Sequence, residues 1–453
     1  MKKFFTIFVV VVLIASCTRN YNEISVSADI IAKNAMTNEE RAKQLVVDML
    51  NRIDPQTRGY VREIERVEFI SKERLLGTRT RTEADSTDTD GGYNFDTSKI
   101  DGLVILNFRD STGYGLVGVG SMVGEPEEFE PGGNNSTPIG LLAITDSGTI
   151  TSEEILSNGD EWTSVGGSGN NNGNSSASTD VSNAEREFLN AILTSYINRK
   201  YTHDGYSTET TLQGGVSSWS VGPLLLTTHW TQYMPFNALI HGAGGEDHRV
   251  AGCTTIAVAQ VLTYLKDKDL SLFGLPELAT WKKIESVNPN DTDASEDESI
   301  WTAQLVKSIA DGMDVKYNYN GSGETMATAK MAKEYLCSLG YDAHKYLGYT
   351  SNDEDRVIGS INNGKPVIMV AVYSTLDFDD IGGHSWVIDG YIRDMNKHSY
   401  YVHCNFGWGG RSNGYYYRGL FNNEDNDDSK LDYDEIKEAV FKYNSFFRTV
   451  IIE

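Results

Sequence analysis

The sequence is short of residue types that several protein classes require. Its 453 residues include only four cysteines, too few for a disulfide-stabilised scaffold, and no CxxC or CxxH pair of the kind found in structural zinc sites. Basic residues are also scarce, because 39 Lys and Arg stand against 64 Asp and Glu, giving a formal net charge of −25. Binding a nucleic acid requires a clustered basic surface, so this balance argues against a nucleic-acid partner.

Histidine is missing from the first 200 residues, and all eight histidines lie from His203 onward. Because imidazole is the side chain most often used for proton transfer near neutral pH, we expect any catalytic chemistry in the C-terminal half. The length suggests roughly two to four domains.

The N-terminal half still carries folding signals. Thr37 and Glu40 form a capping-box pattern ahead of an amphipathic helix. Residues 102–108 and 139–144 have the apolar character of buried strands. Residues 163–180 consist largely of Gly, Asn and Ser with almost nothing to bury, which predicts an exposed, flexible loop.

Only one apolar run could meet a membrane, and it is too short to span a bilayer. Residues 4–14 number eleven, where about 20 are needed. The run follows two lysines and precedes Ala15, Ser16 and Cys17, which is the layout of a secretory signal. A cysteine directly after small residues resembles a bacterial lipobox. We expect residues 1–16 to be a signal peptide and Cys17 to be lipidated; a plain signal peptide with an incidental cysteine is the alternative.

Three cysteines remain after Cys17, so at least one thiol of an exported chain is unpaired within the chain. Cys253 follows a glycine and opens the run 253–265, which is helical in length and apolar nearly all round. A thiol at a helix N-terminus is stabilised as the nucleophilic thiolate. A structural cysteine packed at a helix start is the alternative. Cys337 lies on what the pattern predicts to be the packed face of a helix.

Two further segments carry candidate catalytic side chains. Two glycines precede His384 and an apolar run follows, which predicts an accessible imidazole at the start of a strand, suited to act as general base and acid. A predicted strand at 399–402 leads to Asn405, whose amide could hold an imidazole in the required tautomer while Phe406 and Trp408 shield the contact from water. Taken singly, a structural histidine and an aromatic-glycine turn would explain these segments equally well.

The chain order Cys253, His384, Asn405 is that of papain-like proteases, and four segments resemble the narrower streptopain-type (C10) cysteine proteases of bacteria. They are W-x-Q-x-x-P-F-N from residue 230, G-C-T-T-x-A-x-A-Q from residue 252, G-G-H-S-W-V-I-D-G from residue 382 and H-C-N-F-G-W-G-G from residue 403. The resemblance implies an α+β fold. A papain-like, two-lobed catalytic domain would occupy residues 206–453, and an α+β inhibitory prodomain would occupy residues 17–205.

On this resemblance the chain is the autoinhibited precursor of a secreted or surface-attached cysteine endopeptidase. Cys253 would attack the peptide carbonyl as thiolate, and His384 would protonate the leaving amine. Asn405 would orient the imidazole, and the Gln232 side chain would join the Cys253 backbone N–H in an oxyanion hole. No metal or organic cofactor is implied. The implied partners are protein or peptide substrates, the chain's own prodomain and, before processing, a membrane through the lipid on Cys17.

The implied location is the outer membrane or surface of a bacterial cell, from which the mature protease could be released. Removal of the prodomain is expected near residues 200–216, with the loop at 163–180 as a competing cut site. Another Cys–His–Asn enzyme, an acyl transferase or amidase, is an alternative. A non-catalytic surface adhesin of the same fold is a second alternative, although no structural need requires Cys253, Gln232 and His384 together.

Overall fold

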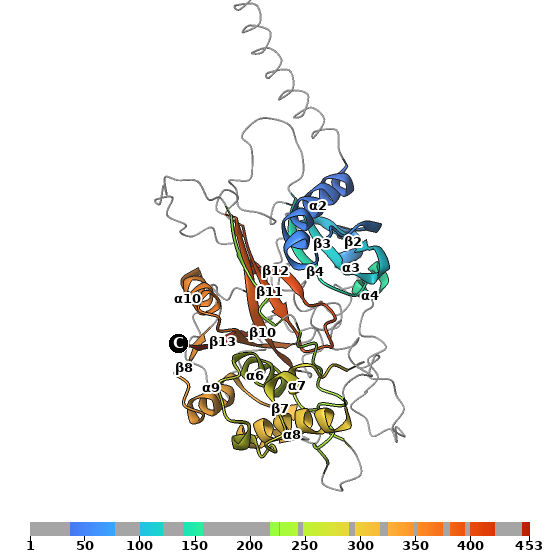
Figure 1. The fold of residues 1–453 in the computed structure, drawn as a ribbon. Helices are drawn as coiled ribbons and strands as arrows, with labels where there is room; N and C mark the ends of the chain where they lie inside the picture. Colours follow the sequence, from blue (N-terminus) through green and yellow to red (C-terminus); the bar gives the residue numbers. More distant parts are fainter. Residues whose placement is uncertain are drawn as a thin grey trace, which may run out of the picture.

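A computed structural model of the chain describes residues 37–77, 100–120, 139–156, 218–225, 227–242, 248–289, 295–317, 325–347, 351–374, 381–394, 399–421 and 446–453. The described residues form a mixed α/β structure (Figure 1). Below, residues 37–156 are called the N-terminal part and residues 218–453 the C-terminal part. The predicted signal peptide, Cys17, the loop at 163–180 and the expected cut region lie outside the described residues.

The N-terminal part is an antiparallel meander with one long helix. Its strands, paired in chain order, are β1 (Ile64–Ser71), β2 (Ile100–Phe108), β3 (Tyr114–Gly120) and β4 (Ile139–Thr145). Two short helices, α3 (Lys72–Gly77) and α4 (Ser152–Leu156), lie beside it. Helix α2 (Asn38–Thr57) begins with the predicted capping box of Thr37 and Glu40, and its apolar side packs on the sheet. Both predicted strands are confirmed as β2 and β4.

In the C-terminal part, helices cover both faces of a sheet (Figure 1). Four helices share the core of one face: α6 (Cys253–Leu265), α7 (Trp281–Glu285), α8 (Glu296–Gly312) and α9 (Ala329–Ser338). Helix α10 (Ser351–Asn362) packs in the core of the other face. The strands are β5 (Ser218–Val221), β8 (Ala343–Leu347), β9 (Val367–Ser374), β10 (Ile381–Asp394), β11 (Ser399–Asn405), β12 (Gly414–Tyr417) and β13 (Phe446–Ile452), besides a small pair, β6 (Lys316–Tyr317) and β7 (Thr325–Met326).

One continuous sheet joins the two parts. The strand order is β1-β2-β3-β4-β12-β11-β10-β9-β13-β8, with β5 also paired to β10. At the junction β4 pairs antiparallel with β12, where Gly414 lies opposite Thr145 and Tyr415 opposite Ile144. A Cβ atom at Gly414 would lie 2.2 Å from the carbonyl oxygen of Ile144, so the close approach of the two strands requires glycine there. The N-terminal part thus extends the sheet of the C-terminal part.

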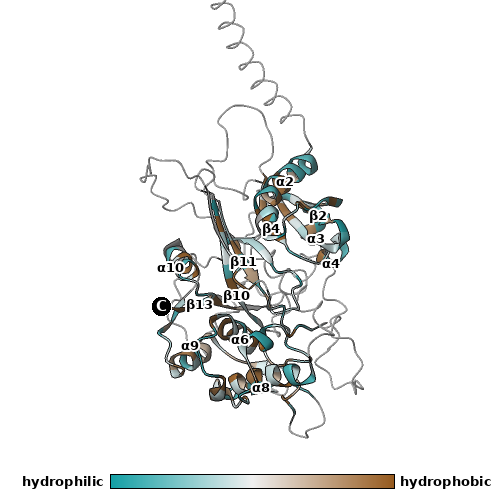
Figure 2. Cartoon of the chain, in the orientation of Figure 1, coloured by the Kyte–Doolittle hydropathy of each residue, from teal (hydrophilic) through white to brown (hydrophobic). Residues whose placement is uncertain are grey.

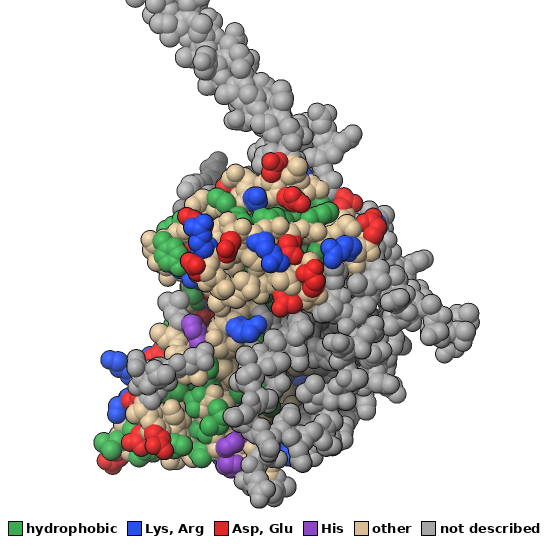
Figure 3. Space-filling view, turned by 90° about the vertical axis from the view of Figure 1, so that its right-hand side faces the viewer, with side chains coloured by type: hydrophobic (Ala, Val, Ile, Leu, Met, Phe, Trp, Pro, Cys, Tyr) green, Lys and Arg blue, Asp and Glu red, His purple; other side chains and the backbone are tan. Residues whose placement is uncertain are grey.

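Apolar packing also crosses the junction. Tyr114 and Leu142 of the N-terminal part share a core cluster with Trp408, and Val46 of α2 shares another with Tyr415. Hydrophobic residues lie on the strands of the sheet and on parts of the helices (Figure 2). Acidic and basic side chains mix over the N-terminal part on the face shown in Figure 3. Within the described segments, no helix has the length and apolar character needed to cross a membrane.

Candidate active site

Cys253 is the first residue of α6, as the sequence predicts. Gly252 caps the helix with φ 91°, in the left-handed region that favours glycine, and a Cβ atom there would lie 2.8 Å from Cγ2 of Thr325. The rest of α6 is buried along most of its length. The half-buried thiol therefore lies on a rigid element, at the end where the backbone N–H groups of the first turn lack intrahelical partners.

Two hydroxyl groups lie beside this thiol. Oγ1 of Thr254 and Oγ of Ser385 are 2.7 Å apart, in a buried contact that joins the start of α6 to β10. Desolvation raises the pKa of the Cys253 thiol, and hydrogen bonds from Ser385 and Thr254 oppose that rise without cancelling it. The thiol is therefore protonated at neutral pH in this state.

His384 precedes Ser385 on β10, so the strand brings it to the end of the sheet that faces the start of α6. Its ring is buried and stacks on Trp408, with 4.6 Å between centroids and 24° between planes. The rings of Phe406 and Trp386 also flank it. The expectation of an accessible imidazole is wrong, because aromatic side chains cover the ring that the two preceding glycines would leave open.

A hydrogen bond to the main chain orients the imidazole. Nε2 of His384 lies 2.9 Å from the carbonyl oxygen of Phe406. Because a carbonyl only accepts, Nε2 carries the proton and Nδ1 is the basic nitrogen. Burial lowers the pKa of His384 to about 4, and the contact with Phe406 opposes that change. The imidazole is therefore neutral at pH 7.

The segment that carries Gln232 is hydrogen-bonded both to the residues just before α6 and to the loop after β11. The carbonyl of Gln232 accepts a hydrogen bond of 2.9 Å from the N–H of Ala251, two residues before Cys253. The carbonyl of Trp230 accepts one of 2.9 Å from Gly409, in the loop that follows β11. Gln232 itself is partly exposed. The structure thus places Gln232 beside the cysteine end of α6.

Part of the chain matches a known protein family. Residues 230–416, which contain the four predicted catalytic residues, match the model of the Peptidase C10 family. This segment resembles a C10 cysteine peptidase domain and is called the C10 domain below. A solved structure of active wild-type interpain A cysteine protease from Prevotella intermedia is similar with 22% identity and a TM-score of 0.36, over 51% of this chain and 94% of that one. No curated protein matches the chain.

In the C10 domain, Asn405 does not contact the imidazole in the way that the sequence suggests. Its Nδ2 donates to the carbonyl of Thr228 at 2.9 Å, and its Oδ1 accepts from the N–H of Gly407 at 3.2 Å. The carbonyl of the next residue, Phe406, makes the contact with His384. Both hydrogen-bonding ends of the buried amide serve the main chain, so Asn405 shapes the turn that presents this carbonyl.

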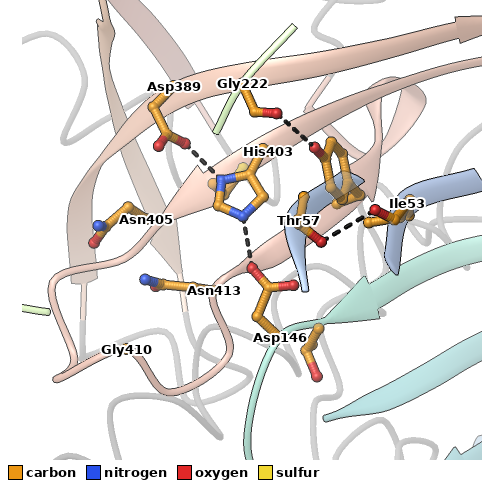
Figure 4. Close-up of polar contacts among 12 residues, drawn as sticks. Ile53, Thr57, Asp146, Gly222, Asp389, His403, Asn405, Gly410 and Asn413 are labelled. Atoms are coloured by element: carbon orange, nitrogen blue, oxygen red, sulfur yellow. Dashed lines mark hydrogen bonds and ion pairs between the residues drawn. The ribbon is translucent and has the colours of Figure 1, made fainter. Parts of the chain in front are cut away.

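The sequence motifs indicate no role for a second buried histidine of the C10 domain, His403. Nδ1 of His403 lies 2.6 Å from Asp389 on β10, and Nε2 lies 2.8 Å from Asp146, just after β4 of the N-terminal part (Figure 4). Burial alone would lower the pKa of His403, but the two carboxylates outweigh it and raise the pKa to about 10. His403 and Asp389 both lie inside the C10-like motifs, whereas nothing local in the sequence marks Asp146 as their partner.

Within the described part of the chain, His, Cys, Asp and Glu side chains do not gather in groups of three or more that could hold a metal ion. The candidate site consists of the residues already described. These are Cys253 and its two hydroxyl neighbours, His384 with the Phe406 carbonyl and the Trp408 ring, and the segment of Gln232.

Proposed function

We propose that this protein is a cysteine endopeptidase made as a latent precursor. One observation supports it above the others: within a C10 domain, Cys253 opens the buried helix α6 while His384 lies on the strand that touches the start of that helix. The Phe406 carbonyl holds Nε2 of His384, which leaves Nδ1 as the base. Nucleophile, base and orienting group are thus supplied by rigid elements.

In the proposed reaction, Nδ1 of His384 takes the proton of the Cys253 thiol, and the thiolate attacks the peptide carbonyl. The imidazolium then gives its proton to the leaving amine, which breaks the C–N bond and leaves an acyl-enzyme. His384 next takes a proton from water, whose oxygen attacks the thioester and releases the carboxylic acid and the free thiol. No redox step or cofactor is involved in this sequence.

The negative charge that develops on the carbonyl oxygen needs donors close by. The backbone N–H of Cys253 lies in the first turn of α6, where it has no intrahelical partner. The side-chain amide of Gln232, held beside the same end of the helix, would be the second donor. Removing one such donor costs about 3–4 kcal/mol of transition-state stabilisation in acyl transfer.

The N-terminal part is proposed to act as the inhibitory prodomain. It is hydrogen-bonded to the loop after β11, which carries Phe406 and Trp408. The Asp146 N–H donates to the Asn413 carbonyl at 2.6 Å, and the Ser147 hydroxyl donates to the Gly410 carbonyl at 2.7 Å. In this docked state the thiol pKa is raised and the His384 pKa is lowered, so proton transfer between them is unfavourable. A neutral pair of this kind is consistent with latency.

Export and anchoring complete the proposal and rest on the sequence alone. The apolar run at residues 4–14 and the cysteine at position 17 support a lipoprotein signal. The precursor would then be held at a membrane by a lipid on Cys17, with its substrates outside the cytoplasm. Cutting between the two parts would release the protease from its anchor.

The proposal is tested with the full-length protein, expressed without residues 1–16 and allowed to process. It is incubated with denatured casein, with and without a thiol-alkylating reagent. Cys253→Ala should abolish cleavage, and Cys337→Ala should leave it intact, because Cys337 packs against the core of α6–α9 away from the site. Casein cleavage at the wild-type rate by the Cys253→Ala protein would overturn the mechanism.

The same experiment separates the two alternatives. Mass spectrometry of the products distinguishes new N-termini, which hydrolysis creates, from isopeptide cross-links, which an acyl transferase would create. A fully folded protein that produces neither with any denatured substrate would instead support a binding role.

A further inference from the structure

The buried His403 is shared by the two parts of the chain. Its Nδ1 contacts Asp389 of the C-terminal part, and its Nε2 contacts Asp146 of the N-terminal part, as Figure 4 shows. Asp389 is fully buried and also accepts a hydrogen bond of 2.8 Å from the N–H of Leu225. This second bond fixes the Asp389 carboxylate, which in turn holds the imidazole so that Nε2 faces the N-terminal part.

Asp146 is held equally firmly from its own side. Arg58, the C-terminal cap of α2, donates from Nη2 to the carbonyl of Asp146 at 2.7 Å and pairs with its carboxylate at 3.3 Å. Arg58 also contacts Asp54, which forms a buried ion pair with Arg62. The carboxylate that meets His403 is thus positioned by residues of the N-terminal part.

The charges around His403 balance only when the imidazole is protonated. The N-terminal part contributes Asp54, Asp146, Arg58 and Arg62, and the C-terminal part contributes Asp389 and His403. Three further titratable groups face the pair. Tyr415 meets the His403 ring edge-on at 4.9 Å, and its hydroxyl donates to the Gly222 carbonyl. The buried thiol of Cys404 lies near Asp389, and the exposed His229 lies near Asp146 and His403. With His403 protonated, three cations face three carboxylates.

The ion pair lies directly at the end of the β4–β12 junction. Thr145, the last residue of β4, pairs with Gly414, and the Asp146 N–H continues the ladder to the Asn413 carbonyl. Residues 139–145 therefore add a strand to the edge of β12, and the next residue supplies the carboxylate. Main-chain pairing of this kind gives affinity without side-chain selectivity, whereas the half-buried carboxylate of Asp146 adds selectivity.

We propose that the edge of β12 together with the Asp389–His403 pair is a recognition site on the C10 domain for an edge strand that ends in a carboxylate. Its occupant is the N-terminal part, through β4 and Asp146. The pair acts as the polar latch of the interface, and the shared apolar clusters supply the non-specific part of the binding. That the latched state is inactive rests on the proposed function; the latch itself does not.

The test uses the full-length chain with Cys253→Ala, which cannot process itself under the proposed mechanism. Hydrogen–deuterium exchange is followed by mass spectrometry in three versions of that chain: otherwise unchanged, Asp146→Asn and Asp48→Asn. Asp48→Asn makes the same chemical change on the exposed face of α2, where the Asp48 carboxylate accepts a hydrogen bond from Gln44 of the same helix. Asp146→Asn keeps the shape of the side chain and removes its charge.

We expect Asp146→Asn to raise exchange of the peptides that contain β4 and β12 by roughly tenfold or more, with α6 and β9 unchanged. The Asp48→Asn chain should match the unchanged one. Equal exchange in the two variants would overturn the latch. Faster exchange throughout the chain, α6 included, would also overturn it, because the pair would then support the whole fold and not the junction.

A second arm separates this inference from the proposed function. With Cys253 intact, Asp146→Asn should shorten the lag before casein cleavage, and Asp48→Asn should not. If exchange at β4 and β12 rises while casein remains uncut by every version, the latch stands and the peptidase proposal fails. If casein is cut and Asp146→Asn changes neither exchange nor lag, the peptidase stands and the latch fails.

Discussion

Nε2 of His384 and the main-chain carbonyl of Phe406 lie 2.9 Å apart, under the ring of Trp408. The orienting group for the imidazole is therefore part of the backbone, and Asn405 acts one step further away by fixing the turn. A main-chain carbonyl carries no charge and cannot be removed by substitution. It performs the task expected of a side-chain amide, because either acceptor selects the tautomer with the proton on Nε2.

Asn405→Ala is predicted to lower stability more than it alters the chemistry. The change leaves the buried Thr228 carbonyl and Gly407 N–H without a partner, at about 1–3 kcal/mol each. The melting temperature should therefore fall. The two apparent pKa values that limit kcat/KM, one at low pH and one at high pH, should stay unchanged. His384→Ala should abolish activity even at alkaline pH, because the leaving amine still needs a proton. A change in either apparent pKa in the Asn405→Ala variant would show that the amide acts on the imidazole.

Local patterns predicted the parts of this molecule that local chemistry determines. The capping box of Thr37 and Glu40 and the placement of Cys253 at the start of α6 follow from side chains within one helical turn. The buried strands β2 and β4 follow from their apolar runs. Residues 253–265 form a helix as predicted, because nothing in that run interrupts it.

Contacts between distant segments could not be predicted in this way. The pairing of β4 with β12 joins residues about 270 positions apart, and strand pairing leaves no mark in either sequence beyond the glycine at 414. The role of the Phe406 carbonyl could not be predicted either. Every residue has a main-chain carbonyl, and the sequence does not indicate which one lies beside the imidazole. The burial of His384 depends on rings that arrive from the loop after β11.

Ser385→Ala is predicted to make the Cys253 thiol harder to ionise. The hydroxyl of Ser385 contacts Thr254 and favours the thiolate, so its loss removes one of the effects that oppose desolvation. The pH at which iodoacetamide labelling of Cys253 becomes faster should then be higher than in the parent chain. Ser338→Ala is the matched control, because its hydroxyl serves only the end of α9. Superimposable labelling profiles for the two variants would contradict this role of Ser385.

The latch at His403 is predicted to weaken at alkaline pH. The pKa of His403 is raised to about 10 in the docked state, above its ordinary value near 6.5, so docking favours the protonated form. The stabilisation is complete below pH 6.5 and is lost as pH rises through about 10. In the Cys253→Ala chain, the melting temperature should exceed that of the Asp146→Asn variant at pH 7, and the gap should narrow by pH 10.5, where only the contribution of the Arg58–Asp146 pair is left. A constant gap across this range would contradict the titration of His403.

Latency is predicted to depend on an intact N-terminal part and on the protein's own nucleophile. The wild-type chain should shorten from 50.2 kDa to little more than half that mass, through a cut near residues 200–216, while Cys253→Ala stays full-length. An earlier cut in the Gly, Asn and Ser stretch at 163–180 would give a transient larger product, because that stretch has almost nothing to bury. The two products are separated by gel electrophoresis and their N-termini read by mass spectrometry. Activity against casein should appear with the smaller product and not before it. If the unprocessed wild-type chain cut casein as fast as the shortened one, the N-terminal part would be a permanent domain of the enzyme and not its inhibitor.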